Sequence, residues 1–159
     1  MKIAPDEIKA VLKVLATTPR RIAAASRVFE NARLHFKPDE ATWSANELLA
    51  HLRACADVWG KSMLMMLAQD QPTLRYVSPR TWIRKTDYLE LEFGVSLQAF
   101  TRQRQELVKS LKVLEIKDWS RSATFTATTK GRQQTVFSYA RRMANHENEH
   151  CEQLEALLK

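Results

Sequence analysis

Residues 44–68 read SANELLAHLRACADVWGKSMLMMLA, and this stretch decides the fold class. It opens with Ser44 and has Glu47 three residues later, which is the pattern of a capping box at the start of a helix. A helix over the whole stretch would be roughly 37 Å long at the standard rise per residue. Apolar side chains at helical spacing form its predicted inward stripe: Leu48, Leu52, Cys55, Trp59 and Met63.

The N-terminal part of the chain predicts two helical segments separated by Thr18 and Pro19. Residues 5–16 carry apolar side chains on one stripe. Thr18 followed by Pro19 is typical of an N-cap with proline at the first helical position, so a second helix is expected over residues 19–36. This second helix either starts anew or continues the first with a kink.

Two further amphipathic helices are predicted over residues 96–114 and 134–158. Four long helices, with an extra helical segment at the N-terminus, predict an all-α fold, a four-helix bundle formed by residues 1–159 as one domain. Residues 69–94 are expected to wrap the bundle as loops and a short helix. Residues 122–129 are rich in threonine and predict a short hairpin or an extended loop before the last helix. An α/β fold is the weaker interpretation, because no helix follows a convincing apolar strand.

The composition is that of an ordinary globular protein, with 45% hydrophobic and 27% charged residues among 159. No segment reaches the roughly 18 apolar residues of a membrane span, and the N-terminus lacks signal-peptide features, so a cytoplasmic protein is expected. The two cysteines fall within helical patterns, unlike a secreted disulfide framework. The net charge of +7 would attract nucleic acid, but the basic residues are dispersed and no binding motif accompanies them, so nucleic acid is not expected as a partner.

Two of the four histidines, His146 and His150, lie four residues apart in the last predicted helix. This spacing places both imidazoles on one side of the helix, one turn apart. With Glu147 they match H-E-x-x-H, a motif in which two histidines bind zinc and the glutamate acts as base. The pattern puts His150 on the inward stripe and His146 beside it, so both imidazoles are expected to face the core. There they would bind a metal ion or hydrogen-bond to Glu or Asn side chains across the bundle.

His51 is the candidate for a third ligand, because it faces inward on the helix that starts at Ser44. Cys55 follows one turn later and is either a fourth ligand or a small buried apolar residue. His35 lies at the end of a predicted helix and is expected to be exposed and not a ligand. A zinc protease of the H-E-x-x-H type is not expected, because the nine residues after His150 contain no histidine to complete its metal site.

Four short stretches of the chain resemble DinB-like proteins. Residues 43–52, WSANELLAHL, resemble the family signature W-S-x-x-E-x-L-x-H-L, and residues 144–150, ANHENEH, resemble its C-terminal H-x-x-x-H. Residues 18–22 and 118–121 also lie where related sequences have similar short motifs, so the resemblance covers nearly the whole chain. One departure is Thr42, where the family often has a glycine; it affects the turn and not the ligands.

The resemblance implies a four-helix bundle with a divalent metal held by His51, His146 and His150. It also implies a metal-dependent hydrolase or a transferase of a low-molecular-weight thiol such as bacillithiol or mycothiol, within a family of damage-inducible, stress-response proteins. A small-molecule partner and a homodimer would follow. Imidazole ligands favour Zn or Ni and do not exclude Fe, Mn or Cu.

Three protein ligands would leave a coordination position for water or a thiolate, which is the usual arrangement of a catalytic site. Glu147 is then the candidate base, provided that its side chain turns toward the metal, and Glu47 or Glu149 would orient a ligand histidine. The alternative is a non-catalytic, metal-stabilised stress-response or small-ligand-binding module, in which Cys55 or a glutamate closes the coordination shell.

Overall fold

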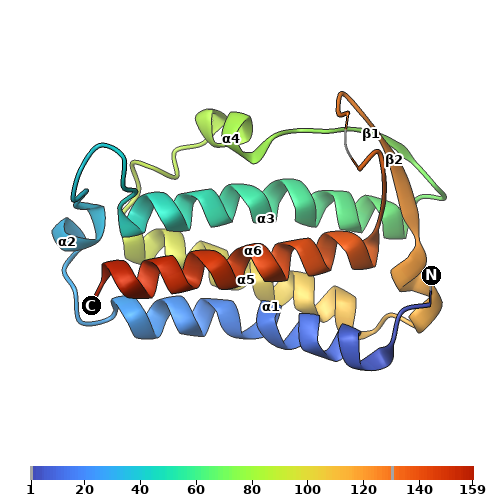
Figure 1. The fold of residues 1–159 in the computed structure, drawn as a ribbon, viewed down its shortest axis with the longest axis horizontal. Helices are drawn as coiled ribbons and strands as arrows, with labels where there is room; N and C mark the ends of the chain where they lie inside the picture. Colours follow the sequence, from blue (N-terminus) through green and yellow to red (C-terminus); the bar gives the residue numbers. More distant parts are fainter. Residues whose placement is uncertain (1, 130) are drawn as a thin grey trace.

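The computed structural model describes residues 2–129 and 131–159, and four long helices form its body (Figure 1). They are α1 (Pro5–Ser26), α3 (Ala45–Ala68), α5 (Phe93–Lys112) and α6 (Val136–Leu157). The predicted all-α four-helix bundle is confirmed. No helix in the described part of the chain is long and apolar enough to cross a membrane.

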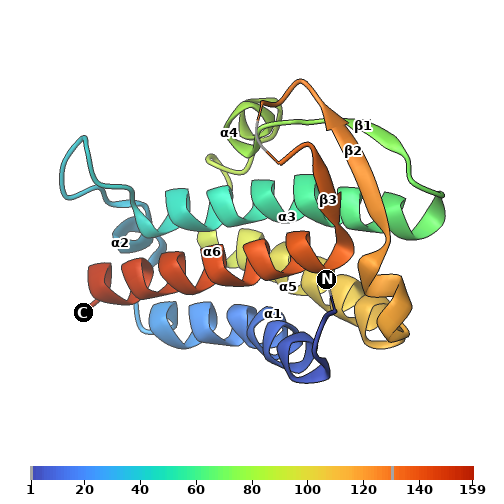
Figure 2. The ribbon, with the colours of Figure 1, turned by 45° about the vertical axis from the view of Figure 1, so that its right-hand side comes forward.

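The helices run in a down-up-up-down order. Helices α1 and α6 point the same way, and α3 and α5 point the opposite way (Figures 1 and 2). Each of α1 and α3 packs against both α5 and α6. The order requires a long return connection between the parallel neighbours α3 and α5. Residues 69–92, called the crossover below, make this connection along the outer side of α3 (Figure 1).

The predicted start and end of α3 are confirmed. The Ser44 hydroxyl accepts a hydrogen bond from the Glu47 backbone N–H at 3.0 Å, and the Ser44 backbone N–H donates to the Glu47 carboxylate at 2.8 Å. These two bonds satisfy backbone donors that have no partner in the first helical turn. Thr135 caps α6 in the same way, since its hydroxyl accepts from the Ser138 N–H at 3.0 Å.

Of the two alternatives predicted at Pro19, the continuation is confirmed, because α1 runs through Pro19 to Ser26. The predicted extension of this helix to residue 36 is wrong. Proline has no N–H, so the carbonyl of Leu15, four residues earlier, loses its helical partner. In the structure the buried Arg104 guanidinium donates to this carbonyl at 3.1 Å. A side chain from α5 thus replaces the hydrogen bond that the Leu15 carbonyl lacks. The helical segment predicted over residues 5–16 is the first half of α1 and not a separate helix. The short helix α2 (Asn31–His35) follows separately.

A small sheet lies over one end of the bundle (Figure 2). Strands β2 (Ser122–Thr126) and β3 (Gln133–Thr135) pair antiparallel, with Ser122 opposite Thr135, which confirms the predicted hairpin. Strand β1 (Thr73–Arg75), from the crossover, adds to β2 in parallel, with Leu74 beside Phe125. The sequence did not predict β1, because three residues are too few to show an alternating pattern.

The remaining elements are short helices. The crossover carries α4 (Pro79–Trp82) and the 3-10 helix η1 (Ile83–Lys85), as the expected loops with a short helix. A second 3-10 helix, η2 (Ile116–Ser120), links α5 to the sheet and buries Trp119.

The core consists of two apolar clusters, one toward each end of the bundle. The cluster beneath the sheet includes Leu15, Met63, Leu111, Trp119 and Met143. The cluster at the other end includes Ile22, Leu48, Leu52, Phe100 and Leu154. Between these clusters along their helices lie two buried polar residues, Arg104 on α5 and Glu147 on α6, and a third, His51, lies on α3 one turn before the clusters meet at Cys55 and Ala56. The middle of the bundle is therefore a polar layer to which three helices contribute.

Candidate metal centre

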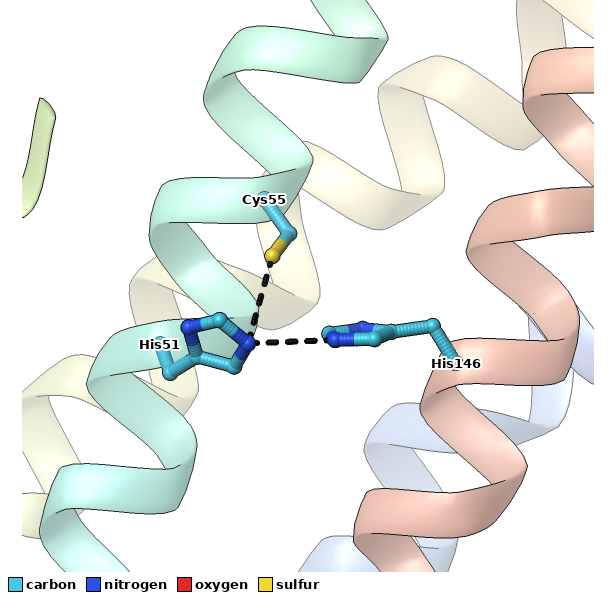
Figure 3. Close-up of side chains that lie close together, drawn as sticks. All are labelled: His51, Cys55 and His146. Carbon is cyan, nitrogen blue, oxygen red and sulfur yellow. Dashed lines mark hydrogen bonds between the residues drawn. The ribbon is translucent and has the colours of Figure 1, made fainter. Parts of the chain in front are cut away.

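The three predicted histidine ligands converge between α3 and α6. The Nε2 atom of His146 lies 3.1 Å from Nε2 of His51 and 3.0 Å from Nε2 of His150. Two nitrogens bound to one zinc ion at about 2.1 Å would lie roughly 3.0–3.4 Å apart at bond angles of about 90–110°. Figure 3 shows His51 on α3 pointing across to His146 on α6. The separations are those of ligands that share one ion.

The donor set also fits a cation better than it fits hydrogen bonds. A neutral imidazole nitrogen is either a donor or an acceptor, so His146 Nε2 cannot form good hydrogen bonds to both neighbouring nitrogens at once. Three lone pairs directed at one ion would satisfy all three atoms together. His146 Nδ1 is buried and has no hydrogen-bond partner among the described residues.

Gln153 fixes the orientation of His150. The side-chain oxygen of Gln153, one turn further along α6, lies 3.0 Å from His150 Nδ1. An amide oxygen can only accept, so this contact places the proton on Nδ1 and leaves the Nε2 lone pair for a metal. Neither acid predicted to orient a ligand has this role. Glu47 bonds to Ser44 and pairs with Lys37 at 3.2 Å, and Glu149 is exposed.

Two of the histidines are held neutral. Burial, with smaller contributions from His150 and Arg80, lowers the pKa of His51 to about 4. Burial, with the charges of His150, His51 and Arg142, lowers the pKa of His146 to about 3. Because a metal binds only the unprotonated imidazole, both side chains are ready to bind a metal ion at neutral pH.

Cys55 belongs to the same cluster. Its Sγ lies 3.6 Å from His51 Nε2, and the ligand atoms of His51, Cys55 and His146 all lie within 4.8 Å of one another (Figure 3). Burial, and next the charge of Glu147, raises the pKa of the Cys55 thiol to about 12. At neutral pH the sulfur is therefore a thiol, and it would become a ligand only by losing its proton to the metal. The structure keeps both predicted roles of Cys55 open.

The two α6 histidines lie at the edge of the bundle and not in its centre. His146 and His150 are half-buried, whereas the buried stripe of α6 runs through Met143, Glu147 and Leu154. The prediction that His150 lies on the inward stripe is therefore wrong, because the next residue, Cys151, is the one that is buried. This shift directs the histidines along the α3–α6 seam, where a small molecule can reach them.

Two tryptophans pack on the histidine rings. The Trp43 ring lies 5.1 Å from the His51 ring and is stacked at 6.1 Å from that of His150. The Trp59 ring meets the His146 ring edge-on at 5.2 Å. These contacts limit how the imidazoles rotate, which preserves their convergence.

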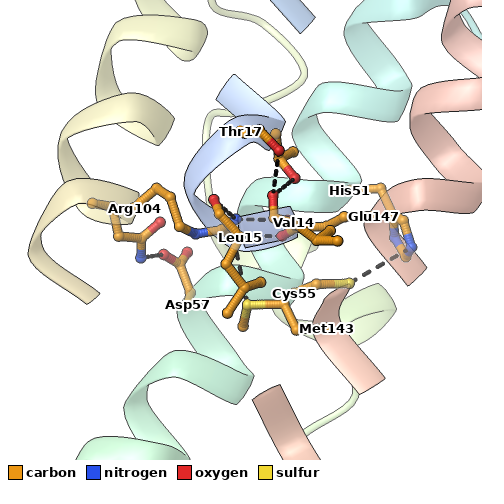
Figure 4. A network of polar contacts seen from close by, with 11 residues as sticks. Val14, Leu15, Thr17, His51, Cys55, Asp57, Arg104, Met143 and Glu147 are labelled. Carbon is orange, nitrogen blue, oxygen red and sulfur yellow. Dashed lines mark hydrogen bonds and ion pairs between the residues drawn. The ribbon is translucent and has the colours of Figure 1, made fainter. Parts of the chain in front are cut away.

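The predicted role of Glu147 as a base requires its side chain to turn toward the histidines. In the structure the side chain turns away from them. Its two carboxylate oxygens accept hydrogen bonds from Arg104, one of them at 2.6 Å, and both side chains are 2% exposed. Figure 4 shows Arg104 between Glu147 and Leu15, whose carbonyl it also binds. The structure thus gives Glu147 a structural partner in the core.

Asp57 attaches the crossover to the bundle. Its carboxylate accepts hydrogen bonds from Trp82 Nε1 at 2.9 Å, from the Tyr88 hydroxyl at 2.5 Å and from Gln103 Nε2 at 2.7 Å. The donors come from the crossover and from α5, so Asp57 joins both to α3.

Sequence analysis missed Arg104, Gln153 and Asp57. Arg104 had a visible signal, because it falls on the apolar stripe of α5 between Phe100 and Leu107, where an unpaired charge would be costly. Gln153 and Asp57 had none, since polar residues on a helix surface are common. His35, predicted to be exposed and not a ligand, lies on α2 outside the cluster, but it is half-buried against the expectation.

A cavity of about 740 Å³ lies between α3, α5 and the crossover. Gly60 opens into it, since a Cβ added there would meet no atom within 4 Å. Among the described residues that line this cavity there is no histidine. It is therefore distinct from the metal centre.

Comparison with known proteins agrees with the fold. The sequence profile of the DinB superfamily matches residues 15–154. This chain belongs to the DinB superfamily. The solved structure of YfiT from Bacillus subtilis, described as "a probable metal-dependent hydrolase with an unusual four-helix bundle topology", is similar with a TM-score of 0.84 and 16% identity, over 98% of this chain and 87% of YfiT. At this identity the likeness shows the shared fold. No curated protein matches this DinB-superfamily chain.

The buried Arg104–Glu147 pair predicts that one isosteric substitution lowers the stability of the fold strongly. Glu147→Gln keeps the shape of the side chain but leaves the buried guanidinium without a countercharge, so the free energy of unfolding should fall by about 3–5 kcal/mol. The matched control is Glu155→Gln, which removes a partly exposed pair with Arg21 and should change it by about 0–1 kcal/mol. Urea denaturation measures both, and equal effects would contradict the assignment.

The neutral histidines predict a pH dependence of the metal-free chain. The unfolded chain takes up protons as the pH falls below the ordinary value of 6.5, whereas His51 and His146 in the folded chain resist protonation down to about 4 and 3. The free energy of unfolding should therefore decrease from pH 6.5 to 5, measured by denaturation with a chelator present. In the His51→Ala/His146→Ala variant the curve over this range should flatten; an unchanged slope would refute the prediction.

Proposed function

We propose that this protein binds one divalent metal ion through His51, His146 and His150 and acts as a metal-dependent hydrolase or a thiol S-transferase. The position of His146 Nε2, 3.1 Å from Nε2 of His51 and 3.0 Å from Nε2 of His150, carries the proposal. A divalent ion held by three neutral imidazoles keeps a coordination position open and lowers the pKa of a bound water or thiol, which suits both reactions.

The chain's own residues would support this chemistry in separate ways. Gln153 holds the His150 lone pair toward the site, and Trp43 and Trp59 restrict the ligand rings. The half-burial of His146 and His150 leaves a route for a small substrate. With Glu147 bound to Arg104, a proton acceptor would be supplied by the substrate or solvent and not by this carboxylate.

Several finer features belong to the same proposal. Zn or Ni suits the imidazole set, and Fe, Mn and Cu are compatible with it. The description of YfiT as a probable hydrolase supports hydrolysis as the reaction over thiol transfer. A low-molecular-weight thiol as substrate and a homodimer are proposed on the family resemblance alone. A cytoplasmic location is proposed on the two free, buried cysteines.

The position of Cys55 supports a second candidate, a non-catalytic metal-stabilised module. If the Cys55 sulfur loses its proton to the metal, it supplies a fourth protein ligand and closes the shell. The high pKa of this thiol opposes that arrangement, so we prefer the open site.

Metal analysis tests the proposal directly. The purified chain should bind about one equivalent of Zn²⁺, and His51→Ala, His146→Ala or His150→Ala should each weaken binding by at least tenfold, because each removes one of three ligands. The control His35→Ala should bind as the parent does. Ester hydrolysis and the conjugation of a thiol to an electrophile are then assayed with loaded protein, and activity should be lost together with the metal. A chain without stoichiometric metal would refute the proposal.

Cobalt substitution separates the open site from the closed one. For the open site, the Co²⁺ absorption spectrum should show no thiolate-to-metal charge transfer, and Cys55→Ala should leave the spectrum and the metal affinity unchanged. Charge transfer that disappears in Cys55→Ala, with a fall in melting temperature and no turnover by the parent, would establish the structural alternative.

A further inference from the structure

Each of two arginines stacks on a tryptophan that in turn packs on the ligand histidines. The Arg80 guanidinium lies 5.8 Å from the Trp43 ring centre, and Trp43 contacts His51 and His150. The Arg142 guanidinium lies 5.1 Å from the Trp59 ring centre, and Trp59 contacts His146. Two cations from different elements, α4 and α6, thus border the same cluster.

Neither cation is neutralised. Arg80 and Arg142 are exposed, and among the described residues neither has a carboxylate within ion-pair distance. Glu147, the buried acid nearest in sequence to the ligands, is already paired with Arg104. The cluster therefore lies in a positive field before any metal is added.

We propose that Arg80 and Arg142 together bind an anionic group of the substrate, a carboxylate or a phosphate, beside the three histidines. The proposal deepens the proposed function, because it names the substrate class of the same site. Guanidinium groups match both anions through paired N–H donors, and stacking on an aromatic ring keeps their edges free to donate.

A cavity beside Arg142, which lies one helical turn before His146, offers space for the organic body of such a substrate; the described residues that line it include neither a histidine nor Arg80. It has a volume of about 180 Å³ and is lined by Arg142 together with Tyr76, Tyr139 and Phe125, among others. Burial raises the pKa of the Tyr139 hydroxyl to about 12, so this group remains a hydrogen-bond donor at neutral pH. A guanidinium beside a protonated phenol and an aromatic ring suits an anion on a small organic body.

Arg80 is held in place although it is exposed. It lies two residues before Trp82, whose indole N–H donates to Asp57, and Tyr88 binds the same carboxylate. These bonds attach the crossover to α3. Arg80 therefore has an anchored backbone, which lowers the entropy lost when it binds an anion.

Calorimetric titration of the zinc-loaded full chain tests the proposal with three probes. Benzoate and phenylphosphonate carry the two candidate anions, and benzamide is a neutral probe of the same size as benzoate. At least one anion should bind about tenfold or more tightly than benzamide, and the tighter one identifies the anion. Arg80→Gln and Arg142→Gln should each weaken its binding by about tenfold.

Two matched variants control for the loss of one positive charge. Arg84→Gln changes the crossover and Arg141→Gln changes α6, where the Arg141 guanidinium lies over Phe137 and not over Trp59. Both should bind within twofold of the parent. Equal losses in the controls, an unchanged affinity in Arg80→Gln and Arg142→Gln, or no preference for an anion would each overturn the proposal.

Metal content, measured on every variant, separates this proposal from the proposed function. Arg80→Gln and Arg142→Gln should keep one equivalent of zinc, so that a weaker anion complex is not a consequence of a lost metal. The titrations are repeated on the metal-free chain. If the parent binds no metal, the proposed function fails, and arginine-dependent anion binding by the metal-free chain still supports or overturns the anion site.

Discussion

The buried contact between Arg104 and Glu147 is the constraint on which the middle of this bundle depends. Two charges with 2% exposure are stable there only because each compensates the other and their remaining hydrogen bonds are made. One of these bonds reaches the Leu15 carbonyl, which is free because Pro19 lacks an N–H. The proline that would weaken α1 alone thus frees an acceptor, the Leu15 carbonyl, and Arg104 uses it to tie α1 to α5 and, through Glu147, to α6.

The same constraint orients the candidate metal centre. Because Glu147 is fixed toward Arg104, the neighbouring His146 must point along the seam toward α3, where it meets His51. His150, one turn later, follows His146 and is held by Gln153. The glutamate between the two histidines of this H-E-x-x-H pattern therefore contacts Arg104 in the core, and this contact restrains the rotation of α6.

Much of the fold could be predicted from local sequence. The capping box of Ser44 and Glu47 and the apolar stripe after it gave both ends of α3, because these signals act within a few residues. Local sequence could not decide between a new helix at Pro19 and a continuation of α1, since the group that replaces the missing proline N–H is Arg104, far along the chain. Strand β1 exists only because β2 lies beside it.

The sequence by itself determined the helical class, the family and the identity of the three candidate ligands, because periodicity and the spacing of His146 and His150 are local properties. Only the tertiary structure decided which way each side chain points. It directed Glu147 into the core, placed His150 at the seam, and brought Arg80 to the cluster through a crossover anchored on Asp57. These outcomes depend on contacts between helices, and a buried charge takes whichever partner the packing supplies.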